Sequence, residues 1–146
     1  MGLSVNNDDF TTADYQQFAN RIRDNLAALK LLLKRPDFGL GPTSFGAELE
    51  MYIIDGDHQV APIYDYLLER CGDKQLQAEL NRFNIEYNLS VVQAQGSPFL
   101  AIEREIEKVI GRLNHHAADK SCQVLPIGIL PTLRKADISS EMISDF

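Results

Sequence analysis

Positive charge is scarce in this chain of 146 residues, which has 14 Lys and Arg against 21 Asp and Glu and a formal net charge of −7. Proteins that bind nucleic acids or anionic membrane surfaces need basic patches. The composition therefore argues against both kinds of partner. Metal ions and ammonium groups are better matched to the negative charge.

Cysteine and long apolar runs are scarce as well. Cys71 and Cys122 stand far apart, with no Cys-x-x-Cys or Cys/His spacing, so we expect neither a zinc site nor a disulfide. The longest apolar runs, such as residues 31–33, are far too short to cross a bilayer. The first residues lack the charged start and apolar core of a secretion signal. We therefore expect a cytoplasmic protein.

Hydrophobic periodicity predicts an α+β fold, with an antiparallel sheet and helices packed on one face. No repeat, low-complexity tract or linker divides the chain, so we expect a single domain over residues 1–146. Proline and glycine mark several element ends. The predicted helices cover about 13–34 and 62–70 and a third stretch beginning at Ser97-Pro98, and the predicted strands cover about 44–54, 81–90 and 123–129.

Two glutamates one residue apart lie in the first predicted strand. Successive strand side chains point to opposite faces, so Glu48 and Glu50 share the polar face, roughly 7 Å apart. Like charges this close repel unless a cation lies between them. Taken alone, the pair is more simply explained as a solvated strand face.

The second predicted strand adds further oxygen ligands. Its polar face carries Glu86, Asn84 and Asn88, together with Arg82. Hard cations such as Mg²⁺ prefer carboxylate, amide and water oxygens. If both strands lie in one sheet, their polar faces form a divalent-metal site. The two asparagines could also position a substrate, and Arg82 could bind a phosphate or carboxylate, or neutralise a nearby glutamate.

Four sequence blocks, in order and spacing, resemble the N-terminal part of type 2 glutamate–cysteine ligases and related carboxylate–amine ligases. The resemblance implies a partial glutamine-synthetase-like catalytic fold, whose antiparallel sheet carries metal-binding carboxylates. The blocks are Gly46-Ala47-Glu48-Leu49-Glu50, residues 79–88, Gly96-Ser97-Pro98-Phe99 and Gly128-Ile129-Leu130-Pro131.

The resemblance also implies an activity. Such enzymes use ATP and Mg²⁺ to phosphorylate a carboxylate, commonly that of glutamate, and an amine or amino acid then displaces the phosphate to form an amide. Mn²⁺ could replace Mg²⁺. Matched position by position, the implied metal ligands are Glu48, Glu50, Glu79 and Glu86. Glu79 precedes the second strand and is the least secure of them.

This sequence departs from the family in two respects. Leu130 stands where many relatives have a histidine, and leucine can neither ligate a metal nor form a hydrogen bond with its side chain. The chain is also much shorter than family members, and it has no P-loop and no Lys/Arg cluster for a nucleotide. We therefore expect an N-terminal fragment of a larger catalytic domain, inactive alone. A truncated sheet would expose a strand edge that can pair with another chain, so the sequence leaves open whether the protein forms a homo-oligomer.

The other polar residues have simpler interpretations. His115 and His116 are adjacent near a helix end and cannot both face one metal ion, and His58 lies in a polar turn. The acidic residues of 103–107 are expected to form a solvated helix face. No Ser/His/Asp or Cys/His arrangement supplies a protein nucleophile, so no catalytic residue is assigned.

One alternative to the ligase stays open. The chain could be a non-catalytic fragment that acts as an assembly module or a metal-binding module. The missing nucleotide contacts favour this alternative.

Overall fold

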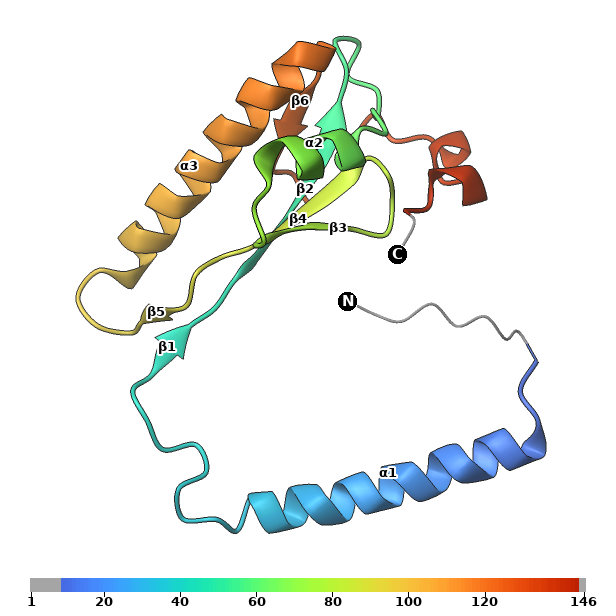
Figure 1. Cartoon of the computed structure of the whole chain (residues 1–146), viewed down its shortest axis with the longest axis vertical. Coiled ribbons are helices and arrows are strands. Elements are labelled where there is room, and N and C mark those ends of the chain that lie inside the picture. The colour runs from blue at the N-terminus through green and yellow to red at the C-terminus, as the bar shows by residue number, and fades with distance from the viewer. Residues whose placement is uncertain (1–8, 145–146) are drawn as a thin grey trace. The chain divides into compact units, whose positions relative to one another are not determined.

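The computed structural model describes residues 9–144 (Figure 1). Its contacts divide the chain into two units, one ending at Pro42 and the other beginning at Thr43. The single domain over residues 1–146 stays a prediction. The physical reason for the division is that the first helix contributes no buried residue to a core.

The first unit contains helix α1 (Thr12–Leu32), close to the predicted bounds. A capping box begins the helix: the Asp14 N–H donates to Thr11 Oγ1, and the Thr11 N–H donates to Asp14 Oδ2 at 2.8 Å. The apolar stripe of α1 is exposed along its length, at Phe18, Ile22, Leu26, Leu29 and Leu33.

The second unit is built around a four-stranded sheet in which every neighbouring pair is antiparallel. Two further short strands form a separate antiparallel pair. The sheet order is β3 (Leu76–Ala78), β4 (Asn84–Asn88), β2 (Glu48–Ile54) and β6 (Gln123–Leu125), and the separate pair is β1 (Ser44–Phe45) with β5 (Val92–Gln93).

The strands differ from the predicted ranges in ways that follow from their pairing. The predicted strand over 44–54 is interrupted at Gly46 and Ala47, because β1 pairs with β5 whereas β2 pairs with β4 and β6. The short strand β3 was not predicted, since three residues carry too little periodicity. The third predicted strand ends at Leu125 rather than at residue 129.

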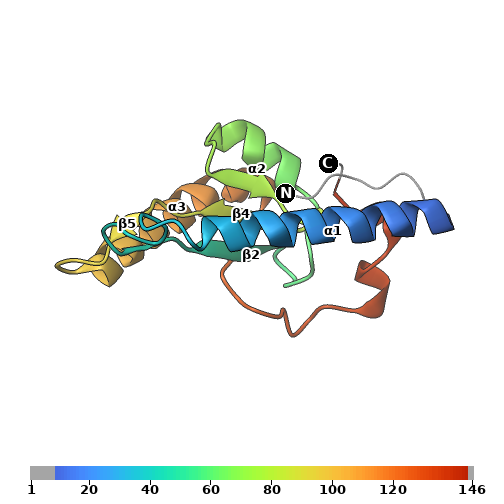
Figure 2. The ribbon, with the colours of Figure 1, turned by 90° about the horizontal axis from the view of Figure 1, so that it is seen from below.

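Helices α2 (Tyr64–Cys71) and α3 (Pro98–Ala117) pack on one face of this sheet (Figures 1 and 2). The predicted antiparallel sheet with helices on one face is confirmed for this unit. Ser97 lies at the N-cap of α3 as predicted, although its side chain makes no capping hydrogen bond. The core between the helices and the sheet includes Met51, Ile53, Leu67, Ile85, Tyr87, Val109, Leu113 and Val124.

Phe83 is fully buried but lies outside the core between the helices and the sheet. Alternation along the second strand would place its ring with Ile85 and Tyr87, but it stacks on Tyr52 at 6.1 Å between ring centroids. Tyr52 follows Glu50 by two residues in β2, on the polar face. An aromatic pair therefore lies on the polar side of the sheet, next to the carboxylates. None of the described helices is long and apolar enough to cross a membrane.

Two leucines on α3 allow a test of this core. Leu113 is fully buried, whereas Leu100 is 43% exposed. We expect Leu113→Ala to lower the free energy of unfolding by about 2–5 kcal/mol, because it removes apolar contacts and leaves a cavity. Leu100→Ala should cost about 1 kcal/mol or less. Urea denaturation would measure both, and equal losses would contradict the assigned core.

Candidate metal centre

The polar face of the sheet places carboxylates from two strands side by side. The β2–β4 register pairs Glu50 with Glu86 and Glu48 with Asn88. All four side chains alternate with core residues such as Met51 and so point away from the helices. The predicted common face of Glu48, Glu50 and Glu86 is therefore consistent with the pairing.

Three of the four predicted metal ligands converge. One carboxylate oxygen from each of Glu50, Glu79 and Glu86 lies within 4.8 Å of the others. Glu79 joins the group because β3 pairs with β4: Gln77 lies opposite Glu86, and Glu79 follows two residues later on the same face. Glu50 is exposed, and the other two are half-buried. We call these three residues the glutamate cluster.

No basic side chain neutralises the glutamate cluster within residues 9–144. The ion pairs of this part of the chain are Arg35–Asp37, Asp73–Arg112 and Arg134–Asp137. One hydrogen bond reaches the cluster from outside, from Asn88 Nδ2 to Glu86 Oε1 at 2.7 Å. This bond fixes one oxygen of Glu86 and leaves the other free for a ligand.

Glu48 lies outside the glutamate cluster, which differs from the predicted four-residue set. It lines a hollow of about 350 Å³ next to its strand partner Asn88. Among the described residues, Glu48 belongs to no group of three or more His, Cys, Asp or Glu side chains close enough to hold a metal ion. The other lining residues of the hollow are Gly46, Ala47, Leu89 and Val91.

The predicted substrate-binding residues have different environments. Asn84 is 8% exposed, donates to the Met51 carbonyl and accepts from Asn81 at 3.2 Å, so it serves the fold and is not open to a substrate. Asn88 orients Glu86, as described above. The backbone N–H of Arg82 donates to the Met142 carbonyl at 2.8 Å, and the Arg82 side chain is half-buried.

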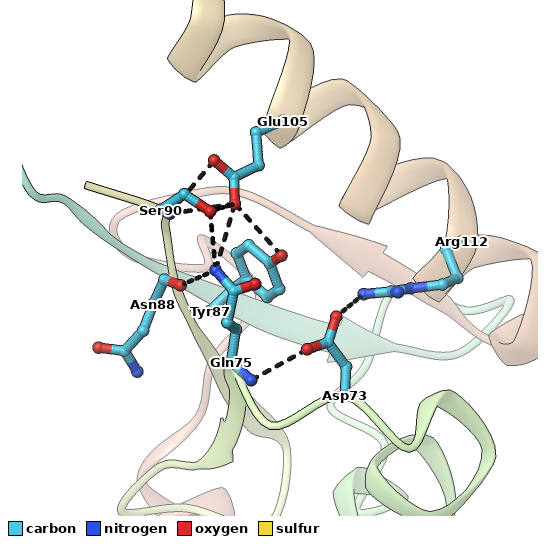
Figure 3. A network of polar contacts seen from close by, with 7 residues as sticks. All are labelled: Asp73, Gln75, Tyr87, Asn88, Ser90, Glu105 and Arg112. Carbon is cyan, nitrogen blue, oxygen red and sulfur yellow. Dashed lines mark hydrogen bonds and ion pairs between the residues drawn. The ribbon is translucent and has the colours of Figure 1, made fainter. Parts of the chain in front are cut away.

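A polar network on the helix side of the sheet was missed by the sequence analysis (Figure 3). Glu105 of α3 accepts hydrogen bonds from the Ser90 N–H, the Ser90 hydroxyl, Gln75 Nε2 and the Tyr87 hydroxyl. We predicted a solvated face at residues 103–107, and this is correct for Glu103 and Glu107, which are exposed. Glu105 is different because it lies three residues after Ile102 and four before Val109, beside the apolar stripe of α3.

Charged groups from α3 and from the segment between α2 and β3 surround this network. Arg112 forms an ion pair with Asp73, and both residues line a hollow of about 450 Å³ with Arg104, Lys108 and Glu105. Hydrogen bonding to the Gln75 N–H, together with Arg112, lowers the pKa of Asp73. Burial raises the pKa of the Tyr87 hydroxyl, with contributions from the nearby carboxylates. Tyr87 therefore stays a hydrogen-bond donor to Glu105 at neutral pH.

The hydrogen bonds to Glu105 predict a pH-dependent contribution to stability. Partial burial raises the pKa of this carboxyl, but the bonds from Ser90, Gln75 and Tyr87 outweigh burial and lower it overall. A lowered pKa in the folded state stabilises the fold above the unfolded value, about 4.3 for glutamate, and the effect is lost as pH falls through the folded value.

We therefore expect the stability difference between wild type and Glu105→Gln to be largest near neutral pH and to shrink below about pH 4.3. Thermal unfolding at a series of pH values would measure it. Glu103→Gln is the matched control, because Glu103 is exposed on the same helix. Parallel curves for wild type and Glu105→Gln would contradict the assigned pKa shift.

The remaining candidates of the sequence form no second cluster. The rings of His115 and His116 lie 5.3 Å apart in an edge arrangement, at the end of α3. In the described chain, the glutamate cluster is the group of His, Cys, Asp and Glu side chains close enough to hold a metal ion.

Comparison with known proteins assigns no family to the chain. No protein-family model matches the sequence, and neither a curated protein nor a solved structure matches it. The functional conclusion therefore depends on the chemistry of the glutamate cluster and its surroundings.

Proposed function

We propose that this chain supplies the metal-binding half of an ATP- and Mg²⁺-dependent carboxylate–amine ligase of the glutamate–cysteine ligase type. The observation that carries the proposal is the convergence of Glu50, Glu79 and Glu86 within 4.8 Å on the open face of an antiparallel sheet. This arrangement supports the glutamine-synthetase-like fold that the sequence resemblance implies.

The donor set of the glutamate cluster fits a hard divalent cation. Mg²⁺ binds oxygens at about 2.0–2.1 Å in octahedral geometry, so neighbouring ligand oxygens lie about 3 Å apart. The carboxylate oxygens of the cluster, within 4.8 Å of one another, reach this spacing by small side-chain rotations. Water and substrate oxygens would complete the shell. Mn²⁺ prefers the same oxygen ligands.

Electrostatics supports the same assignment. Two unit charges 4.8 Å apart repel by about 0.9 kcal/mol even at the dielectric constant of water. Glu79 and Glu86 are half-buried, so the repulsion between them is screened less. A bound cation offsets this repulsion, and the cluster then gains stability on binding.

In the proposed reaction, the chain's own residues bind and orient. Glu50, Glu79 and Glu86 hold the cation, which when bound supplies charge neutralisation for the phosphates of ATP. Asn88 holds Glu86 in place through its 2.7 Å hydrogen bond. Arg82 is the candidate for binding a phosphate or a substrate carboxylate. A carboxylate such as that of glutamate would become an acyl phosphate, and an amine would displace the phosphate.

A second candidate function is an assembly module that binds metal without catalysis. The exposed apolar stripe of α1 favours it, because a helix with this pattern usually buries that face against another surface. A second copy of the chain would provide such a surface.

The glutamate cluster predicts that one substitution has opposite effects on binding and stability. We expect Glu79→Gln to weaken Mn²⁺ binding at least tenfold, because an amide is a poorer ligand than a carboxylate. The same change should leave the metal-free protein as stable or more stable, because it removes a repelling charge. Calorimetric titration and thermal unfolding would measure the two effects, with Glu103→Gln as the control. Unchanged Mn²⁺ affinity would refute the metal assignment.

The ligase proposal also predicts that nucleotide and metal bind cooperatively. A non-hydrolysable ATP analogue should increase Mn²⁺ affinity several-fold, because the cation would contact both the cluster and the phosphates, and linkage requires the reverse effect as well. Titrations with and without the analogue test this. Mn²⁺ binding that is independent of nucleotide would instead support the metal-binding module.

A further inference from the structure

We propose that Glu105 is a positioning residue for the metal centre, acting across the sheet through Gln75 and Asn88 to orient Glu86. This inference rests on the proposed function, because it assumes that Glu86 is a metal ligand. Glu105 itself would touch neither the cation nor a substrate.

The first step is the anchoring of Glu105. Its carboxylate accepts from the Ser90 N–H at 3.1 Å, the Ser90 hydroxyl at 2.9 Å, Gln75 Nε2 at 3.2 Å and the Tyr87 hydroxyl at 3.4 Å. Hydrogen bonds to an ionised acceptor are stronger than neutral ones. Glu105 therefore ties α3 to Ser90, in the segment after β4, and to Gln75, in the segment before β3.

The second step is a clamp on the backbone of Asn88 (Figure 3). Gln75 Nε2, which also donates to Glu105, donates to the Asn88 carbonyl at 2.8 Å. The Asn88 N–H donates to the Gln75 carbonyl at 2.8 Å. The peptide groups on both sides of Asn88 Cα are thereby fixed.

The third step crosses the sheet. Side chains alternate along β4, so Tyr87 points to the helix side, where Glu105 lies, while Glu86 and Asn88 point to the cluster side. Asn88 Nδ2 donates to Glu86 Oε1 at 2.7 Å. A fixed Asn88 backbone therefore limits the positions of the amide that orients the metal-binding carboxylate.

The chemistry of the four donors explains why a carboxylate is needed at position 105. All four donors reach Glu105 Oε1, and the Ser90 N–H also reaches Oε2 at 3.2 Å. A glutamine removes the negative charge that strengthens every one of these bonds, and its NH₂ group cannot accept from the Ser90 N–H. Some of the donors would lose their partner, and the clamp on Asn88 would loosen. Partners of metal ligands typically change metal affinity by about 10–100-fold when mutated.

The test uses the full 146-residue chain and three matched variants. Mn²⁺ dissociation constants are measured by electron paramagnetic resonance well below the melting temperature, and the Asn88 side-chain amide is followed by ¹⁵N NMR without metal. Glu105→Gln should weaken Mn²⁺ binding about tenfold and shift the Asn88 amide signals. Glu103→Gln should change neither.

A double-mutant cycle separates positioning from general stability. Asn88→Ala removes the last link to Glu86, so adding Glu105→Gln to it should produce no further loss of Mn²⁺ affinity. The melting temperature should still fall on adding Glu105→Gln, because the bonds to Ser90 and Tyr87 are lost regardless.

Each outcome decides one of the two proposals. Unchanged Mn²⁺ affinity in Glu105→Gln, or additive losses in the double mutant, would overturn the positioning role and leave Glu105 as a purely stabilising residue. If wild type binds no Mn²⁺, the metal-centre proposal fails, and the Asn88 amide signals alone decide the coupling: a shift in Glu105→Gln supports it, and unshifted signals overturn it.

Discussion

The antiparallel register between β2 and β4 is the constraint on which the candidate site depends. It pairs Glu50 with Glu86 and, on the opposite face, Met51 with Ile85. The same pairing therefore assembles the core and the polar face together. A slip of one residue would turn the carboxylates into the core, where an unpaired charge is costly. Burial of the apolar face thus also holds the glutamates in place.

The glutamate cluster gathers negative charge that the fold itself does not need. Three carboxylates meet without a basic partner in the described chain, and the core on the other face stabilises the sheet against their repulsion. Local destabilisation of this kind is typical of functional sites. In the proposed function, a divalent cation bound here would turn this repulsion into binding energy, which is the basis of the proposed ligase chemistry.

Strand β4 connects the two faces of the sheet. Tyr87 enters the core and reaches Glu105 of α3, whereas the neighbouring Glu86 and Asn88 face the cluster. The helix layer and the glutamate cluster therefore share one strand whose backbone is clamped by Gln75. This arrangement gives α3 a structural route to the carboxylates, although it lies on the other side of the sheet.

Sequence alone predicts which side chains share a face and where helix α3 begins. The alternation around Glu48 and Glu50, and around Glu86, indicated a common acidic face, and Ser97-Pro98 indicated the start of α3. These features depend on residues close in sequence, whose geometry is fixed by the periods of strands and helices.

The fold settles which residues of that face meet. It brought Glu79 into the cluster through β3, left Glu48 outside, buried Asn84, and gave Glu105 four hydrogen-bond donors. Periodicity assigns a side chain to a face, but its neighbours come from strand pairing and packing between distant segments, which local sequence does not specify.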